Sequence, residues 1–286
     1  MYQKHILIFN RLSSIYEKLG DENRATAYHN LSKKLELGDT ETVSEKSWKK
    51  IEEINETGTL KILSDFEKDK KIMARIKLTN IIGVGPKVAE KLVNEGITTF
   101  NQFKKLPNLT SLQQLGVKYH NKIDLPSASV FKRVMTVLKN GMVDLIKIEI
   151  AGSYRMGNRK PNDIDLIVCT KTGDINLVLS LLKDLDYVVS GENDILGIIT
   201  IKGKFYRIDI KCVAPKYLHS YLLYFGSGKY FSKYIRGIAK EQGYKLNRYG
   251  IINLKTGELK TFRSEQAIFK FLKVPYLTPK ERKKYY

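Results

Sequence analysis

Residues 152–168 read GSYRMGNRKPNDIDLIV, and two aspartates in this stretch stand at the head of an apolar run. Side chains two positions apart in a strand point to the same face of a sheet. We therefore expect Asp163 and Asp165 on one face of a strand, with Ile164 and Val168 on the buried face behind them. Such a strand would aim both carboxylates at one place.

A second strand, KFYRIDIKCV at 204–213, carries a third carboxylate, Asp209, between two isoleucines. Asp209 shares its face with Arg207 and Lys211, and we expect Arg207 to orient it or tune its basicity. If the two strands are neighbours, three carboxylates converge. Their repulsion is relieved by divalent cations, and three carboxylates are enough for two metal ions.

A glycine–serine pair precedes the paired aspartates. Gly152 lets backbone approach a phosphate closely, and Ser153 can donate to phosphate oxygens. Taken alone, the aspartate pair could equally be a solvated strand end or a partner for nearby lysines. The order of glycine–serine, aspartate pair and later single aspartate favours a metal-dependent nucleotidyltransferase.

The composition points to a polyanionic partner. Fifty Lys and Arg against thirty Asp and Glu give the 286-residue chain a net charge of +20. Nucleic acid is the first choice, because each phosphate neutralised releases counterions. The alternatives are an anionic membrane surface or solubility alone, and no apolar run is as long as a membrane span.

The hydrophobic fraction of 42% is enough for folded cores, and the length allows two domains or several small modules. Cys169 and Cys212 lie in apolar strand-like runs and indicate buried thiols. We expect a soluble intracellular protein and do not distinguish nucleus from cytoplasm.

The segment GVGPKVAEKL at 83–92 indicates a hairpin between helices. Gly83 and Gly85 permit a tight turn, and Pro86 suits the first turn of the next helix. The amides at that helix start can bind a DNA phosphate without reading sequence. The alternative is an ordinary glycine turn.

These segments, in this order, resemble the family X DNA polymerases, the DNA polymerase beta group. The resemblance is carried by residues 78–103, by GSYRMG with NDIDLIV and YRIDI, and by YFGSGKYFSKYIRGIAKEQGYKLNRYG at 224–250. It implies an α+β fold in four parts. They are an all-helical 5′-deoxyribose-phosphate lyase-like domain at 1–77, a fingers-like helix–hairpin–helix subdomain at 78–126, a palm with a mixed β-sheet at 127–213 and a small α/β thumb, which binds the nascent base pair, at 214–286.

The resemblance implies a DNA-directed DNA polymerase that fills short gaps in repair. Asp163, Asp165 and Asp209 match the ligands of two Mg²⁺ ions, for which Mn²⁺ can substitute. Asp209 would also help to deprotonate the primer 3′-hydroxyl, which attacks a dNTP.

Further contacts follow from the resemblance, with a monovalent cation, Na⁺ or K⁺, held by backbone carbonyls at the hairpin. The residues expected at the nucleotide are Gly152, Ser153, Arg155, Asn162, Lys122, Tyr224, Phe225, Gly226 and Ser232. Those expected at DNA are Gly83, Gly85, Lys87, Lys233, Arg236 and Tyr249. Those expected at the monovalent cation are Thr79, Ile81 and Val84.

The chain departs from the family at several places. Met156 stands where a second phosphate-binding arginine is common, and Arg155, Arg159 or Lys160 could compensate. The turn beside the sugar reads GSG at 226–228, and Arg248 replaces an acidic residue. These changes motivate the hypothesis of reduced fidelity.

The first module resembles the family's lyase domain, with Lys50 in the register of the Schiff-base nucleophile. Lys46, Lys49 and Arg24 would bind the 5′-phosphate, and Tyr28 would line the site. The first hairpin, DTETVSEKSW, lacks a glycine pair. The alternative is a solvated lysine on a helix face.

Gapped or nicked duplex DNA and dNTPs are the expected partners of a monomer that does not bind membranes, with a repair partner such as a ligase. A template-independent terminal nucleotidyltransferase is the nearest alternative. A non-catalytic DNA-end-binding protein is a further one, against which the three retained carboxylates argue.

Overall fold

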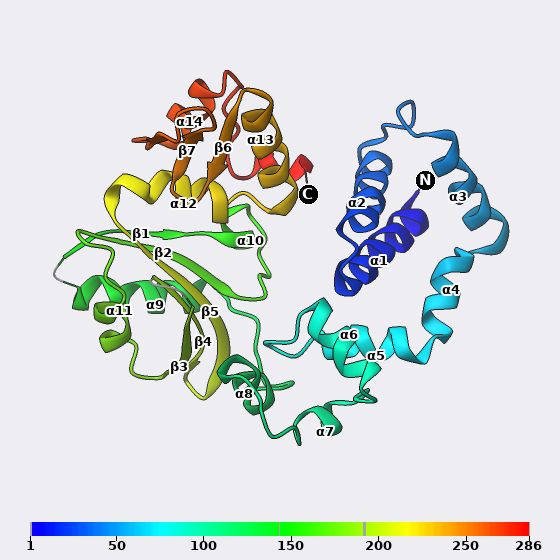
Figure 1. The fold of residues 1–286 in the computed structure, drawn as a ribbon, viewed down its shortest axis with the longest axis horizontal. Helices are drawn as coiled ribbons and strands as arrows, with labels where there is room; N and C mark the ends of the chain where they lie inside the picture. The colour runs from blue at the N-terminus through cyan, green and yellow to red at the C-terminus, as the bar shows by residue number, and fades with distance from the viewer. Residues whose placement is uncertain (1, 143, 191–192, 286) are drawn as a thin grey trace. The chain divides into compact units, whose positions relative to one another are not determined.

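The computed structural model describes residues 2–142, 144–190 and 193–285, and the chain divides into two compact units, residues 1–120 and 121–286 (Figure 1). The regular elements described in the first unit are all helices. They are α1 (Gln3–Leu19), α2 (Glu22–Leu37), α3 (Glu45–Thr57), α4 (Lys61–Lys68), α5 (Lys70–Leu78), α6 (Pro86–Asn94), α7 (Phe100–Phe103) and α8 (Ser111–Lys118). The division into four domains stays a prediction.

Glycines end the first three helices. Gly20, Gly38 and Gly58 each have a left-handed backbone with φ of 85°, 73° and 81°. Glycine adopts this conformation without the steric penalty of a Cβ atom. These ends let α1–α4 fold back on a shared core that includes Phe9 and Ile54.

The second unit mixes helices and strands. Its helices are α9 (Ala128–Gly141), α10 (Gly152–Arg155), α11 (Asn176–Leu181), α12 (Leu218–Phe225), α13 (Lys229–Glu241) and α14 (Glu265–Phe271), with 3₁₀ turns η1 (Pro215–Tyr217) and η2 (Glu281–Tyr285). Its strands are β1 (Leu145–Ile150), β2 (Ile164–Thr170), β3 (Leu185–Ser190), β4 (Asp194–Ile201), β5 (Lys204–Val213), β6 (Tyr244–Asn247), β7 (Gly250–Asn253) and β8 (Leu259–Lys260).

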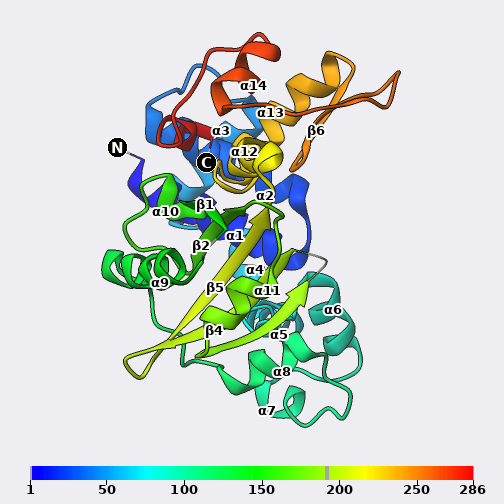
Figure 2. The ribbon, with the colours of Figure 1, turned by 90° about the vertical axis from the view of Figure 1, so that its left-hand side faces the viewer.

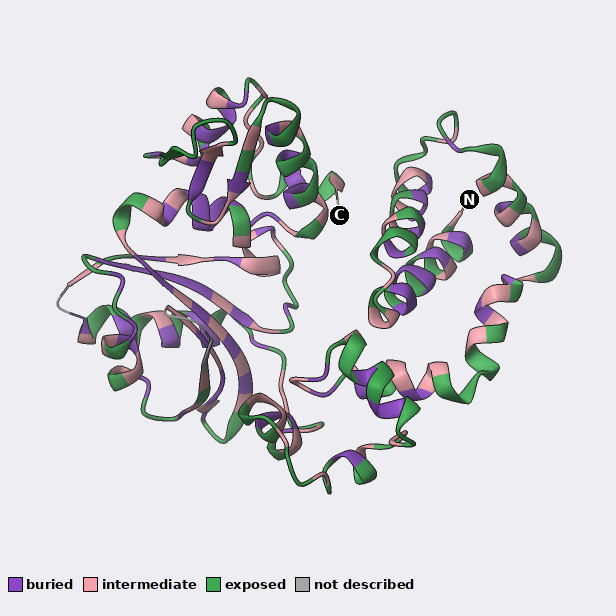
Figure 3. Cartoon of the chain, in the orientation of Figure 1, coloured by how far each residue is buried: buried purple, intermediate pink, exposed green. Residues whose placement is uncertain are grey.

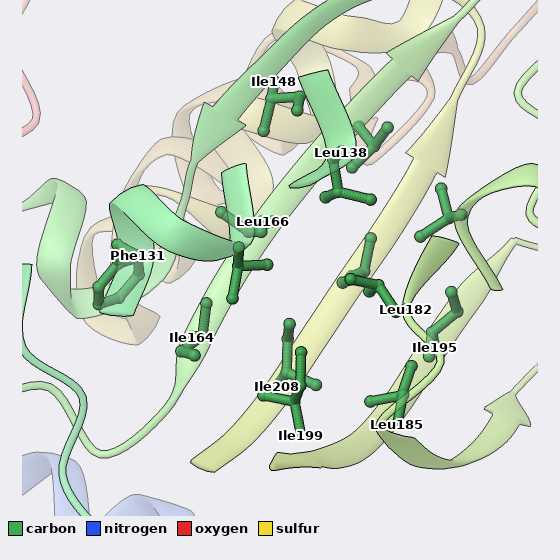
Figure 4. Packing of buried hydrophobic residues seen from close by; sticks show 14 of the residues in the cluster. Phe131, Leu138, Ile148, Ile164, Leu166, Leu182, Leu185, Ile195, Ile199 and Ile208 are labelled. Carbon is green, nitrogen blue, oxygen red and sulfur yellow. The ribbon is translucent and has the colours of Figure 1, made fainter. Parts of the chain in front are cut away.

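The described part of this unit contains a sheet in the order β1-β2-β5-β4-β3, in which β2 and β5 are parallel and the other pairs antiparallel. The expected mixed sheet is therefore confirmed. Helices α9 and α11 pack on one face and α12 on the other (Figures 1 and 2). The face under α9 is closed by residues such as Phe131, Ile164 and Ile208 (Figure 4).

The opposite face is covered only in part. Ile167, Cys169 and Val213 pack against Leu218 and Leu222 of α12. Asp165 and Asp209 lie on the same face of the sheet. Asp165 comes two residues before Ile167 in β2, and Asp209 comes four residues before Val213 in β5. Both aspartates are only partly buried. The sheet thus presents carboxylates beside a covered apolar strip.

A smaller sheet, β6-β7-β8, packs with α13 and α14 around Phe231, Ile235, Ile251 and Phe269. The buried positions of the helices and strands face these cores, and the exposed positions face outward (Figure 3). Among the residues described, no helix is long and apolar enough to cross a membrane.

Candidate active site

The register of the central strands brings the predicted carboxylates together. In the parallel pair β2–β5, Asp165 stands opposite Asp209, and Ile164 opposite Ile208. Ile164 and Ile208 are fully buried while both aspartates are half-buried, so the predicted division of faces is confirmed. The condition that the two strands be neighbours is met, whereas the metal-binding role stays a prediction.

Gly152 begins α10 directly against Asp165. Its φ is 56°, and a Cβ atom added there would lie 1.8 Å from Oδ2 of Asp165. Only glycine permits so close an approach of backbone to the carboxylate. The Ala151 amide also donates to the Asp165 carbonyl at 2.9 Å, which fixes the start of the turn that carries Ser153.

The carboxylates act on one another. Burial, the charges of Asp163 and Asp209 and a hydrogen bond with Asp163 raise the pKa of Asp165 to about 7, against the opposing charge of Arg207. A cluster that resists full ionisation is one that a divalent cation would stabilise. The three side chains therefore fit a metal site chemically.

The trio does not form a closed metal cage by itself. Among residues 2–142, 144–190 and 193–285, no group of three or more His, Cys, Asp or Glu side chains is arranged to hold an ion. Mg²⁺ characteristically takes one or two carboxylates together with substrate phosphates. A substrate would therefore have to complete the ligand set.

Two basic residues on β5 take different partners. Nε of Arg207 lies 3.9 Å from Oδ2 of Asp163, whereas Nζ of Lys211 lies 2.8 Å from Oδ1 of Asp209. Lys211, and not Arg207, is thus the ion-pair partner of Asp209. Its place two residues after Asp209 on the same face was the signal in the sequence.

Replacing Asp165 with asparagine should stabilise the metal-free protein. A carboxyl group with a raised pKa binds its proton more tightly in the folded than in the unfolded state, so ionising it costs stability as the pH rises from 3.8 through about 7. We expect Asp165→Asn to gain about 1–2 kcal/mol near pH 8 and little near pH 4. Thermal denaturation in EDTA, with exposed Asp184→Asn as control, measures this; no gain near pH 8 would contradict it.

Arg155 forms an ion pair with a buried carboxylate, that of Glu265. Its Nη2 lies 2.5 Å from Oε2 of Glu265, while Oε1 of Glu265 lies 2.8 Å from Nη1 of the fully buried Arg282. Arg282 also donates to Ser227 at 2.8 Å. Arg155 and Glu265 are 110 residues apart along the chain, so the pattern of the sequence does not suggest this pair. Arg155 as a nucleotide contact stays a prediction, with its guanidinium engaged elsewhere in this structure.

Replacing Glu265 with glutamine should destabilise the second unit, because it leaves the fully buried guanidinium of Arg282 and the partly buried one of Arg155 without a counter-charge. Burial alone would raise the pKa of Glu265, but hydrogen bonds and charges from Arg155 and Arg282 outweigh it and lower the pKa. We expect a loss of about 3 kcal/mol at neutral pH. The loss should shrink as the pH falls below the ordinary glutamate pKa of 4.5, since the stabilisation exists only above it.

Thermal denaturation followed by circular dichroism measures this loss. Glu258→Gln, at an exposed position of the same unit, is the matched control. Equal melting temperatures for Glu265→Gln and Glu258→Gln would show that the buried carboxylate is not needed.

The residues expected at the sugar and base gather where α12 meets α13. Tyr224 is 36% exposed, and its carbonyl accepts a hydrogen bond of 3.4 Å from Ser232. The Arg236 guanidinium lies 5.7 Å from the Tyr224 ring centre, and Lys211 lies 5.2 Å from that of Phe225. The structure thus brings these candidates to one region, with Gly226 in the turn between the helices.

Arg248 has an acidic partner in this chain. Its Nη1 lies 3.0 Å from Oδ2 of Asp194 on β4, and Lys211 reaches the same carboxylate oxygen at 3.4 Å. Arg248 also donates to the Tyr249 hydroxyl at 3.0 Å. Where the resemblance leads one to expect an acidic residue, this chain has Arg248, and Asp194 on β4 supplies the opposite charge.

Other candidates lie on the surface of their units. Asn162, Lys122 and Lys233 are exposed in the second unit, and Gly85 and Lys87 in the first. Gly83 has a φ of 83°, and Gly85 precedes α6 with no side chain capping that helix. The backbone carbonyls expected to hold a monovalent cation, those of Thr79, Ile81 and Val84, lie in the loop between α5 and α6, where the Ile81 carbonyl also accepts the Val84 amide at 3.0 Å.

The lysine candidate lies over an aromatic pair in the first unit. Nζ of Lys50 is 4.3 Å from the ring centre of Tyr28, which stacks on Tyr16 at 5.6 Å. Burial lowers the pKa of Lys50, against the charge of Glu53. Arg24 lies over Tyr16, and Lys46 and Lys49 are exposed on α3, where Lys49 pairs with Glu45 at 3.0 Å.

Aspartates on adjacent parallel strands, with a glycine–serine turn pressed against one of them, are the arrangement of a nucleotidyltransferase. Family models agree with this class. The DNA polymerase beta thumb matches residues 221–283, and the fingers domain of DNA polymerase lambda matches residues 77–124.

Curated relatives extend the match over nearly the whole chain. DNA polymerase lambda of Arabidopsis thaliana is 28% identical over 323 aligned positions, covering 96% of this chain and 61% of the relative. DNA polymerase lambda of Rattus norvegicus is 23% identical, covering 95% and 54%. The DNA polymerase/3′-5′ exonuclease PolX of Bacillus subtilis is 29% identical over 140 positions, 48% of this chain and 24% of the relative.

The chain is thus similar to family X DNA polymerases over nearly its whole length. It spans little more than half the length of the two DNA polymerase lambda relatives.

Proposed function

We propose that the chain is a DNA-directed DNA polymerase that fills short gaps during DNA repair. The observation that carries the proposal is the register that sets Asp209 opposite Asp165, with Gly152 pressed against the same carboxylate. Similarity to family X DNA polymerases supports DNA and dNTPs as substrates. The net charge of +20 supports a phosphate-rich partner.

Asp163, Asp165 and Asp209 would hold two Mg²⁺ ions, which when bound neutralise the triphosphate and favour ionisation of the primer hydroxyl. Asp209 accepts the proton of the 3′-hydroxyl. The 3′-oxygen then bonds to the α-phosphorus while the bond from that phosphorus to the bridging oxygen breaks, and pyrophosphate leaves. Ser153 donates to phosphate oxygens, so catalysis is mainly positioning and charge neutralisation.

Lys211 would have to leave Asp209 if both carboxylate oxygens of Asp209 are to be free for a metal ion. It sits 2.8 Å from Asp209 and 3.4 Å from Asp194, so a small rotation of its ammonium would transfer it to Asp194. Asp194 in turn is held by Arg248. Before metal binds, the charges of Lys211 and Arg248 balance those of Asp194 and Asp209. A move of Lys211 to Asp194 would free the carboxylate of Asp209 for the metal.

A second activity, removal of a 5′-deoxyribose phosphate, is favoured by the environment of Lys50. Its amine attacks the sugar aldehyde, water leaves to give an imine, and a proton and the phosphate are then lost by β-elimination. A lowered pKa leaves more of the amine in its nucleophilic form at neutral pH. Tyr28 would line the site, and Arg24, Lys46 and Lys49 would bind the 5′-phosphate.

Template dependence tests the polymerase against its nearest rival, a terminal nucleotidyltransferase. We expect Mg²⁺-dependent extension of a primer on gapped duplex DNA and none of a single-stranded oligonucleotide. Efficient extension of the single strand without template would favour the rival. Binding to DNA ends with no incorporation on either substrate would favour a non-catalytic end-binding protein.

The proposed partners are gapped or nicked duplex DNA and dNTPs, bound by a monomer that hands its product to a repair enzyme such as a ligase. Gly83, Gly85 and Lys87 would contact the backbone of the DNA through the hairpin before α6. Lys233, Arg236 and Tyr249 would contact it through the second unit. Reduced fidelity, motivated by Met156, the GSG turn and Arg248, stays a hypothesis that a misinsertion assay would test.

A further inference from the structure

A small cavity lies between α12, α13 and the end of β6. Its polar lining comes from Ser220 on α12, Ser232 and Arg236 on α13, and Asn247 at the end of β6, and Tyr224 also lines it. The cavity has a volume of about 10 Å³, which is close to the smallest volume that accommodates a water molecule. A single water molecule is therefore the ligand that this cavity fits.

The hydroxyl group of Ser220 is buried without a protein partner. Ser220 is 1% exposed, and no residue in the described part of the chain forms a hydrogen bond with its Oγ atom. A serine in a helix can bond to the carbonyl one turn earlier, here that of Lys216, but Ser220 does not. Nearly all buried polar side-chain atoms in proteins are bonded to protein or to ordered water, because an unbonded one destabilises the fold. The Ser220 hydroxyl therefore needs a small hydrogen-bonding ligand in the cavity.

Other residues that line the cavity hold Tyr224 in place. The Ser232 hydroxyl donates to the Tyr224 carbonyl at 3.4 Å, and Nε of Arg236 donates to the Ser232 carbonyl at 2.9 Å. The Arg236 guanidinium also lies 5.7 Å from the centre of the Tyr224 ring. Ser220 precedes Tyr224 by one turn of α12, so the two residues lie on the same side of that helix. The cavity is thus lined by Tyr224 and by the residues that fix its backbone and ring.

We propose that this cavity binds one water molecule and that Ser220, through this water, is a positioning residue for Tyr224, a reading that rests on the proposed function. The water would form one hydrogen bond with Oγ of Ser220. It would donate another to Oγ of Ser232, whose own proton goes to the Tyr224 carbonyl. The 3.4 Å bond from Ser232 is long, and a water that fixes the Ser232 hydroxyl would keep it aimed at Tyr224.

Asn247 supplies a third partner for the water. Its Oδ1 accepts hydrogen bonds from the amides of Tyr249 and Gly250 at 2.8 Å and 3.1 Å, which fixes the side chain. Its amide nitrogen can then donate to the water. Together with Ser220 and Ser232, Asn247 gives the water three partners, the usual number for a buried water molecule.

A fixed Tyr224 matters for the choice between deoxyribose and ribose. The proposed function places Tyr224 beside the sugar of the nucleotide, where close packing would reject a 2′-hydroxyl. Rejection of one additional hydroxyl depends on how rigidly the protein wall is held, since a wall that can retreat admits the larger sugar at little cost. Loss of the water would therefore lower the selectivity for dNTP over rNTP, while incorporation of dNTP itself should change little.

A crystal structure tests the water, and steady-state kinetics test the role of Ser220. We expect an ordered water about 3 Å from Oγ of Ser220 in the unsubstituted protein. Ser220→Ala should lower the ratio of kcat/KM for dNTP to kcat/KM for the matching rNTP by about fivefold, through a lower KM for rNTP, with kcat for dNTP within about twofold. Ser220→Thr keeps the hydroxyl and should retain most of the selectivity. The control Ser180→Ala removes an exposed hydroxyl from α11 and should change the ratio by less than about twofold.

A cavity without water in that crystal structure would overturn the proposal. Selectivity in Ser220→Ala equal to that in Ser180→Ala, with normal incorporation of dNTP, would reject the role of Ser220 and leave the polymerase function standing. An equal loss of selectivity in Ser220→Ala and Ser220→Thr would also reject it, because the hydroxyl would then not be the group that matters. If the unsubstituted protein incorporates no nucleotide, the polymerase function and the role in sugar selection fail together, whereas the crystal structure still decides whether the cavity binds water.

Discussion

Asp209→Ala should lower the rate of single-nucleotide incorporation by roughly 1,000-fold or more while leaving gapped-DNA affinity nearly unchanged. Asp209 would be both a metal ligand and the acceptor of the primer proton, so its loss removes two contributions at once. It stands opposite Asp165 on the neighbouring strand, and the paired residues described in β2 and β5 include no further carboxylate. Single-turnover incorporation and fluorescence anisotropy on the same substrate measure the two quantities.

The control for this variant is Asp184→Ala, an exposed aspartate before β3 in the same unit. It should retain incorporation within about twofold, as expected for a surface substitution. Circular dichroism confirms that both variants are folded. Incorporation by Asp209→Ala at the rate of Asp184→Ala would remove Asp209 from the catalytic site.

Lys50→Ala should abolish the covalent adduct that borohydride traps on incised abasic DNA, a loss of at least about 100-fold. The imine forms only from the amine of the nucleophilic lysine, and borohydride reduces it to a stable secondary amine. The lowered pKa of Lys50 and its position 4.3 Å from the Tyr28 ring centre set it apart from the exposed lysines of α3. Denaturing electrophoresis of the protein–DNA adduct measures the loss.

Two further variants make this test specific. Lys50→Arg keeps the charge but cannot form the imine at useful rates, and should lose the adduct like alanine. Lys71→Ala, at an exposed position of α5, should keep it. Persistence of the adduct in Lys50→Ala would assign the chemistry to another amine.

Local features of the fold were predictable because they depend on residues close in sequence. The alternation of Asp163 and Asp165 with buried Ile164 follows from strand geometry and is confirmed. The helix ends at Gly20 and Gly38 follow from the backbone freedom of glycine. The need for glycine at position 152 was expected on the grounds of phosphate approach, and the structure adds the contact with Asp165.

Long-range pairs were not predictable, because they depend on which segments the topology brings together. The sequence suggested that Arg155, Arg159 or Lys160 compensates for the missing arginine at position 156. Only the structure shows that Arg155 is bound by Glu265. Likewise Lys280 and Lys283 line a pocket together with Arg159. Asp194 as the shared partner of Lys211 and Arg248 also required the pairing of β4 with β5.

Incorporation opposite each of the four template bases in a one-nucleotide gap tests the central claim most directly. With Mg²⁺ and all four dNTPs, the account predicts addition of one nucleotide, complementary to the template base, and no addition when Asp209 is replaced by alanine. A 5′-phosphate on the downstream strand should increase the rate if Arg24, Lys46 and Lys49 bind it. Addition that ignores the template base, or no addition by the unsubstituted protein, would contradict the account.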